Sequence, residues 1–125
     1  MTLKQISVFL ENKQGTLAEA TKVLGENDID LIALSIADTA DFGIMRCIVN
    51  QPDKALALLV EHGFAASTTE VLAVEVPDQP GGLASVLMLL DKNNLNVEYL
   101  YSFVRTPNEN ALLNGFIRRT RFSGL

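Results

Sequence analysis

The sequence of 125 residues carries a net charge of −5 at pH 7, and 48% of its residues are hydrophobic while 20% are charged. This balance is typical of a globular chain and excludes a disordered one, and the acidic excess argues against a nucleic-acid-binding protein, which needs a basic surface. Because Met1–Lys4 contains no apolar signal segment and no run reaches transmembrane length, we expect a cytoplasmic protein without a membrane partner.

A strand and a helix open the chain. Alternating apolar residues predict a strand over Gln5–Glu11. Thr16 and Glu19 have the spacing of a capping box, so we expect a helix that starts at Thr16. Gly25 and Asn27 are residues that close a helix, and they predict its end.

Strands and a second helix complete the first seventy residues. The apolar runs predict strands over Asp30–Ala37, Gly43–Asn50 and Phe64–Glu70, with a polar turn over 38–41 between the first two. Pro52 suits the first position of a helix, in which we expect Leu56, Leu59 and Val60 to be buried, and Gly63 suits its end. The order β-α-β-β-α-β is that of the ferredoxin-like fold.

The same pattern recurs sixty-six residues later. A shift of that length places Gly15 on Gly81 and the segment Asn27–Leu31 on Asn93–Val97. An internal repeat of this kind predicts the architecture more firmly than any single residue does. We therefore expect two α+β units in tandem, residues 1–70 and 71–125.

The second unit is predicted to be incomplete. Its expected elements are a strand over Val71–Val76, a helix with an apolar stripe at Leu83, Val86, Leu87 and Leu90, strands over Asn96–Val104 and Ala111–Ile117, and a turn over 106–109. The repeat predicts a further helix and strand, but the tail Arg118–Leu125 resembles neither. An apolar surface without its helix favours association, so we expect a homodimer or higher oligomer, with Phe122 and Leu125 as candidates to pack into the gap.

Signals for catalysis, metals and cofactors are weak. His62 falls at a predicted helix end, where the helix dipole favours an imidazole. Cys47 is the single cysteine and fits a buried thiol in a strand. Tyr99, Tyr101 and Phe103 alternate and could stack on RNA bases, but the acidic chain favours a core or interface role. We expect no catalytic residue, no metal and no cofactor.

The two glycine loops carry the candidate site. Each loop leads into a helix N-terminus, where free backbone N–H groups suit a carboxylate. For a zwitterionic amino acid, the N–H groups at Gly15–Leu17 would bind the carboxylate and Asp30 or Asp78 the ammonium. From the residues alone, an alternative stays open. In it, Asn12 and Asp78 form Asx turns before the helices, and Asp30 and Asn96 form turns between a helix and a strand.

With these loops the sequence resembles the ACT domain, a regulatory module of amino-acid metabolism that binds small molecules. The similarity covers 4–70 fully and 71–117 as an incomplete second copy. The resemblance implies that an Asn or Asp three residues before the loop glycine, and another that opens the second strand, bind an amino acid at the junction of two ACT units. The candidate ligand-binding residues are Asn12, Gln14, Gly15, Thr16, Leu17, Asp30, Asp78, Gly81, Gly82, Leu83 and Asn96.

We accordingly predict a non-catalytic regulatory protein that binds an amino acid and passes the signal to a partner, with an enzyme of amino-acid metabolism as a further candidate partner. The first alternative is a ligand-free adaptor or regulatory subunit that binds an enzyme through its apolar sheet. Strands apolar on both faces favour it, with Ile32, Leu34 and Ile36 on one face and Leu31 and Ala33 on the other. A small enzyme on the same fold is a second alternative, which needs a reactive constellation that the sequence does not offer.

Overall fold

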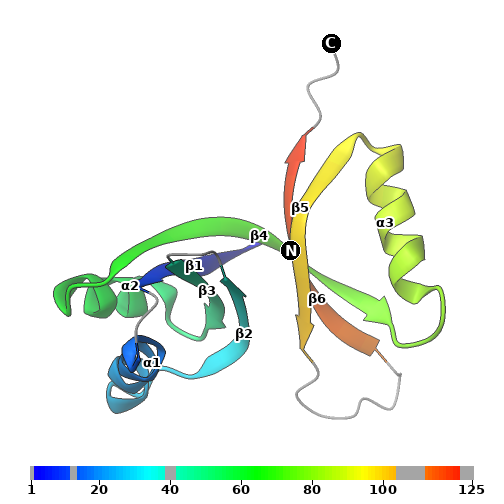
Figure 1. The fold of residues 1–125 in the computed structure, drawn as a ribbon. Coiled ribbons are helices and arrows are strands. Elements are labelled where there is room, and N and C mark those ends of the chain that lie inside the picture. Colours follow the sequence, from blue (N-terminus) through cyan, green and yellow to red (C-terminus); the bar gives the residue numbers. More distant parts are fainter. Residues whose placement is uncertain (1, 12–13, 39–41, 104–111, 122–125) are drawn as a thin grey trace. The chain divides into compact units, whose positions relative to one another are not determined.

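The computed structural model describes residues 2–11, 14–38, 42–103 and 112–121 (Figure 1). Its contacts divide the chain into two compact units. The first unit is Lys4–Thr69, and the second is Glu70–Leu125 together with Met1–Leu3. The elements are β1 (Thr2–Glu11), α1 (Thr16–Glu26), β2 (Leu31–Asp38), β3 (Phe42–Val49), α2 (Pro52–Glu61), β4 (Ala65–Pro77), α3 (Gly82–Lys92), β5 (Leu95–Phe103) and β6 (Leu112–Arg121).

The first unit has the predicted order β-α-β-β-α-β. Its strand order is β2-β3-β1-β4, and β1 and β2 are each antiparallel to β3. The helices α1 and α2 contact each other, and Figure 1 shows both on the same side of the strands. The core between strands and helices includes Ile6, Val8, Met45, Cys47, Ala20, Leu24, Ala55 and Leu59.

Helix α1 begins at Thr16 as predicted, but the expected capping box is wrong. The N-cap is Gly15, and no side chain forms a capping hydrogen bond. The Thr16 hydroxyl instead donates to the Glu11 carbonyl oxygen at 2.9 Å. Because the hydroxyl is bonded to the Glu11 carbonyl at the end of β1, it does not bind a backbone amide of the helix. Thr16 is therefore the first residue inside the helix and not its cap.

The end of α1 also differs in detail from the expectation. Gly25 lies inside the helix, and Asn27 is the C-cap as expected. The following Asp28 has φ 59°, and the Ile29 N–H donates to the Leu24 carbonyl at 3.0 Å. Because Asp tolerates the left-handed conformation, it does here what glycine does at many helix ends.

The predicted buried stripe of α2 is only partly right. Leu59 is fully buried, Leu56 is half-buried and Val60 is 53% exposed. Ala55, one helical turn before Leu59, is fully buried in its place. The buried stripe thus follows an i, i+4 pair, and Val60 lies about 100° further round the helix. Pro52 starts the helix and Gly63, with φ 88°, follows its C-cap, both as predicted.

The strand β4 replaces two strands that we expected to be separate, Phe64–Glu70 and Val71–Val76. It runs without interruption from Ala65 to Pro77. No glycine, proline or polar turn cluster separates the two predicted segments, so nothing in the chain breaks the extended conformation. The boundary between the two units falls inside this strand.

In the second unit the strand order is β4-β6-β5, with β6 antiparallel to both neighbours, and α3 contacts β5 (Figure 1). The strand β6 continues to Arg121, which pairs with Leu95, so the prediction that this strand ends at Ile117 is wrong. Arg118 explains part of the extension, because its guanidinium contacts the Glu98 carboxylate at 3.3 Å and the Glu70 carbonyl at 3.0 Å.

Some predicted features lie outside the described residues. They are the turn over 106–109, most of the turn over 38–41, and the tail residues Phe122 and Leu125.

Candidate functional site

The two glycine loops have the same backbone conformation. Gly15 has φ 92° and Gly81 has φ 84°, and each is the N-cap of the helix that follows. At the far ends of these helices, Asp28 and Asn94 have φ 59° and 58°. Each pair is separated by sixty-six residues, so the repeat seen in the sequence is also a repeat of local geometry.

The loop before α1 presents backbone amides. The first intrahelical hydrogen bond runs from the Glu19 N–H to the Gly15 carbonyl at 2.9 Å. The N–H groups of Leu17 and Ala18 therefore have no acceptor within the helix. Leu17 is 37% exposed and Gln14 is also exposed, so this end of the helix is open to solvent.

The loop before α3 has the same arrangement. The Ser85 N–H donates to the Gly81 carbonyl at 3.0 Å, which leaves the amides of Leu83 and Ala84 without an acceptor in the helix. Leu83 is 42% exposed, and Asp78 is exposed as well. Both helix N-termini can thus receive a small anion.

One of the positions at which the two loops differ holds Thr16 in the first loop and Gly82 in the second. The Thr16 hydroxyl reaches the Glu11 carbonyl. A Cβ atom on Gly82 would instead run into the carbonyl oxygen of Pro77, far inside van der Waals contact. That oxygen accepts the Gln79 N–H at 2.9 Å. Gly82 is therefore required for the close approach of backbone to backbone, and its role is to shape the loop.

Asp30 does not lie near the first glycine loop. The register pairs Glu11 at the end of β1 with Phe42, whereas Leu31 at the start of β2 pairs with Val49. These two positions are the opposite ends of the eight-residue strand β3, roughly 23 Å apart at about 3.3 Å per residue. The residues of the first unit that we predicted to bind one ligand are thus separated by the length of a strand.

The second unit separates its candidate residues in the same way. Pro77, just before the loop, pairs with Leu112, whereas Leu95 pairs with Arg121 at the other end of β6. Asn96 is exposed and lines a hollow of about 270 Å³ there, together with Asp91, Asn94 and Leu95. In the first unit, therefore, the glycine loop lies at one end and Asp30 at the other. In the second unit, the glycine loop lies at one end and Asn96 at the other.

Asp30 itself lies in a helix-to-strand turn. Its N–H donates to the Asn50 side-chain oxygen at 3.0 Å, and the Asn50 N–H donates back to the Asp30 carbonyl at 3.2 Å. The residue is exposed. No local pattern in the sequence predicts the contact with Asn50, because the two residues are 20 positions apart in the chain. The remaining candidate, Asn12, lies outside the described residues.

A hollow of about 360 Å³ lies beside the loop of the first unit. Its lining residues come from the ends of β1, α1, β3, α2 and β4 and are Phe9, Leu10, Glu11, Thr16, Glu19, Phe42, His62, Gly63, Phe64 and Ala65. The His62 ring Nδ1 lies 2.8 Å from the Leu58 carbonyl oxygen, at the end of α2. No local sequence pattern predicts this hollow, since its walls come from elements that are distant in the chain.

The described residues hold few reactive groups. Burial raises the pKa of the Cys47 thiol to about 12, so it stays protonated and is a poor nucleophile. Within residues 2–11, 14–38, 42–103 and 112–121, no group of three His, Cys, Asp or Glu side chains could hold a metal ion. No helix in this part of the chain is long and apolar enough to cross a membrane.

Known proteins resemble this chain over most of its length. The profile of the ACT domain pair family matches residues 1–115. The crystal structure of protein BT0572 from Bacteroides thetaiotaomicron has 47% identity and a TM-score of 0.88, and the match covers 96% of this chain and 81% of that one. The ligand-free regulatory subunit of aspartate kinase from Thermus thermophilus shares the fold, with a TM-score of 0.66 at 15% identity, over 94% of this chain and 87% of that one. No curated protein sequence matches. On the family profile and the 47% identical structure, the chain belongs to the ACT domain pair family.

Proposed function

We propose that this protein is a non-catalytic regulator that binds a free amino acid at its glycine loops and passes the signal to a partner protein, with ACT domains over residues 1–70 and 71–125. The observation that carries the proposal is the duplicated loop, in which a left-handed glycine opens a helix whose first amides lack an intrahelical acceptor. Membership of the ACT family supports it. The name of one structural neighbour, a regulatory subunit of aspartate kinase, points to regulation in amino-acid metabolism.

The first loop would bind the α-carboxylate of the ligand. The N–H groups of Leu17 and Ala18 donate to the two oxygens, and the dipole of α1 adds about 0.3–1 kcal/mol. The Asp30 carboxylate would bind the ammonium group. Because Asp30 lies at the other end of its own unit, the Asp30 in contact with the ligand comes from a second copy of the chain.

The second loop would form a site of different charge. The first site combines Asn12 with Asp30, and the second combines Asp78 with Asn96. An amide in place of Asp30 binds an ammonium group less strongly than a carboxylate does. We therefore expect the loop at Gly81 to bind the same amino acid more weakly.

The hollow beside the first loop would receive the ligand side chain. Phe9, Phe42 and Phe64 give it apolar walls, while Glu11 and Glu19 make it negative. An acidic side chain would meet these carboxylates at close range. The expected ligands are thus amino acids with an apolar or basic side chain.

A ligand-free adaptor is the second candidate function, and exposed apolar side chains on the strands favour it. Phe9, Leu34, Ile36 and Phe42 are between 44% and 52% exposed. Such side chains are typical of a protein interface. This candidate predicts that no amino acid stabilises the protein.

Asp30→Ala is expected to weaken binding of the amino acid by about 1.5–3 kcal/mol, or roughly 10- to 150-fold, since a charge-assisted hydrogen bond to the ammonium group is lost. Titration calorimetry measures the change, with the amino acid that stabilises the protein most. Asp53→Ala is the matched control, because Asp53 is an exposed carboxylate that pairs with Lys4 on the surface. Equal affinity in the wild type and in Asp30→Ala would place the ammonium group elsewhere.

A further inference from the structure

The polar side chains described in the hollow beside the first loop act as hydrogen-bond acceptors. Glu11 and Glu19 each contribute a carboxylate, which accepts hydrogen bonds and donates none. The Thr16 hydroxyl has a single hydrogen, and it donates that hydrogen to the Glu11 carbonyl at 2.9 Å. Toward the hollow, therefore, Thr16 can offer a lone pair and not a hydrogen.

His62 is an acceptor as well. Its Nδ1 lies 2.8 Å from the Leu58 carbonyl oxygen. Because a carbonyl oxygen only accepts, Nδ1 carries the hydrogen of the neutral ring, and Nε2 keeps a lone pair. Nearby backbone donors are already engaged, since the N–H groups of Gly63 and Phe64 donate to carbonyl oxygens of α2 at 3.0 and 2.9 Å. A ligand group in this hollow is therefore favoured if it brings its own N–H donors.

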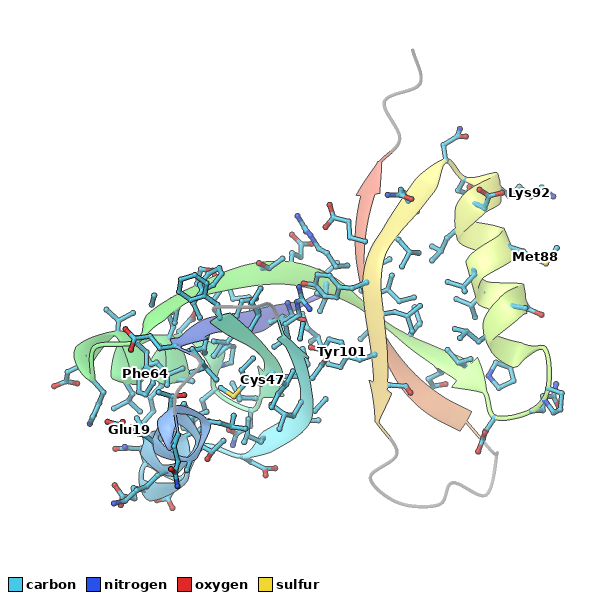
Figure 2. All side chains as sticks on the ribbon, in the orientation of Figure 1. Glu19, Cys47, Phe64, Met88, Lys92 and Tyr101 are labelled. Carbon is cyan, nitrogen blue, oxygen red and sulfur yellow. The ribbon has the colours of Figure 1, made fainter. Side chains whose placement is uncertain are left out.

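The walls of the hollow are aromatic. Phe9 and Phe42 are 51% and 52% exposed, although both are large apolar side chains. Phe64 lines the hollow from the start of β4, and Figure 2 shows it in the first unit together with Glu19 on α1. The described lining contains no lysine and no arginine. Aromatic walls with carboxylates among them fit a methylene chain that ends in a cation.

The repeat shows that the fold of the loop does not need these carboxylates. Sixty-six residues after Glu11 and Glu19 stand Pro77 and Ser85. The loop before α3 nevertheless has the same left-handed glycine cap and the same first helical hydrogen bond as the loop before α1. The two carboxylates of the first unit are thus extra to the shared loop geometry, which supports a role in binding.

We propose that the first loop prefers amino acids whose side chain ends in an ammonium or guanidinium group, and that Glu19 determines this preference. The inference rests on the proposed function, in which the loop amides bind the α-carboxylate. A ligand of this class has a net positive charge, so Glu11 and Glu19 attract the molecule as a whole. Its terminal N–H donors satisfy the acceptors of the hollow, while its methylene groups contact the phenylalanine rings.

Titration calorimetry of the full chain with L-lysine and L-norleucine tests the preference. The two ligands share the same side-chain stem, and norleucine lacks the terminal ammonium group. We expect lysine to bind at least about tenfold more tightly, because a charge-assisted hydrogen bond is partly open to solvent here. Norleucine that binds as tightly as lysine would overturn this inference and leave amino-acid binding intact. If no amino acid binds, the proposed function fails together with the inference.

Glu19→Gln tests the role of the carboxylate. The variant should lose about tenfold in affinity for lysine and keep its affinity for norleucine within about twofold. Glu26→Gln is the matched control, because Glu26 is an exposed carboxylate at the far end of the same helix, 3.7 Å from Lys22. It should bind both ligands as the wild type does.

The ratio of the two affinities separates recognition from a structural effect. A carboxylate in the first turn of α1 also stabilises the helix, but loss of that stabilisation would weaken both ligands equally. Glu19→Ser, which copies the equivalent position of α3, should give the same change in ratio as Glu19→Gln. If both variants keep the wild-type preference for lysine, the ligand cation does not contact Glu19 and the inference is wrong.

Discussion

Gly15→Val is expected to abolish amino-acid binding at the first loop. Gly15 has φ 92°, a conformation that a β-branched residue adopts at a cost of about 1–2 kcal/mol. Apart from its two chain neighbours, no described residue has an atom within 4 Å of a Cβ atom built on Gly15, so the valine side chain would occupy the open space through which the ligand approaches the Leu17 amide. Titration calorimetry should show the affinity reduced at least about a hundredfold, or more than about 2.7 kcal/mol.

Gly15→Asn separates backbone strain from steric blocking. Asn tolerates positive φ, as Asn94 does in this chain at φ 58°, so this variant should keep the loop conformation. We expect Gly15→Asn also to bind poorly, because its side chain fills the same space, while its melting temperature stays near that of the wild type. If Gly15→Val binds the amino acid as tightly as the wild type, the ligand does not contact this loop.

Gly82→Ala is expected to lower the free energy of unfolding by about 2–3 kcal/mol, because the added methyl group overpacks the loop. Its Cβ atom would meet the Pro77 carbonyl oxygen and carbonyl carbon, which are backbone atoms that cannot move aside as a side chain can. Urea denaturation measures the change through the shift of the unfolding midpoint at constant slope.

Gly43→Ala is the matched control for this prediction. A Cβ atom on Gly43 would have its nearest neighbours at 3.9 and 4.0 Å, which is ordinary contact. This variant should change the free energy of unfolding by less than about 1 kcal/mol. An unfolding midpoint for Gly82→Ala equal to that of Gly43→Ala would show that the second loop can open at no cost.

Much of the fold could be predicted, because the repeat and the hydrophobic periodicity are local signals. The sequence was enough to predict that helices begin at Thr16 and at Pro52. It was also enough to predict the order of elements in the first unit. The capping role of Thr16 did not, since the competing acceptor on Glu11 comes from a strand end that only the folded loop brings close. The exposure of Val60 was likewise unpredictable, because an apolar residue beside a buried stripe looks the same in sequence as one within it.

The candidate site was predictable only in part. The glycine loops have a local signature, and the structure gives both the expected left-handed cap. The hollow beside Phe42 and Phe64 depends on strand and helix ends that are distant in the chain. Tertiary contacts of this kind leave no pattern in the local sequence.

A thermal-shift screen of the twenty common amino acids tests the central proposal most directly. We expect one or a few amino acids with apolar or basic side chains to raise the melting temperature, with a stabilisation of about 2.7 kcal/mol at a concentration a hundredfold above the dissociation constant. The stabilisation should disappear in a variant that combines Gly15→Val with Gly81→Val. If no amino acid shifts the melting temperature of the wild type at millimolar concentration, the protein is not an amino-acid sensor and the ligand-free adaptor takes its place.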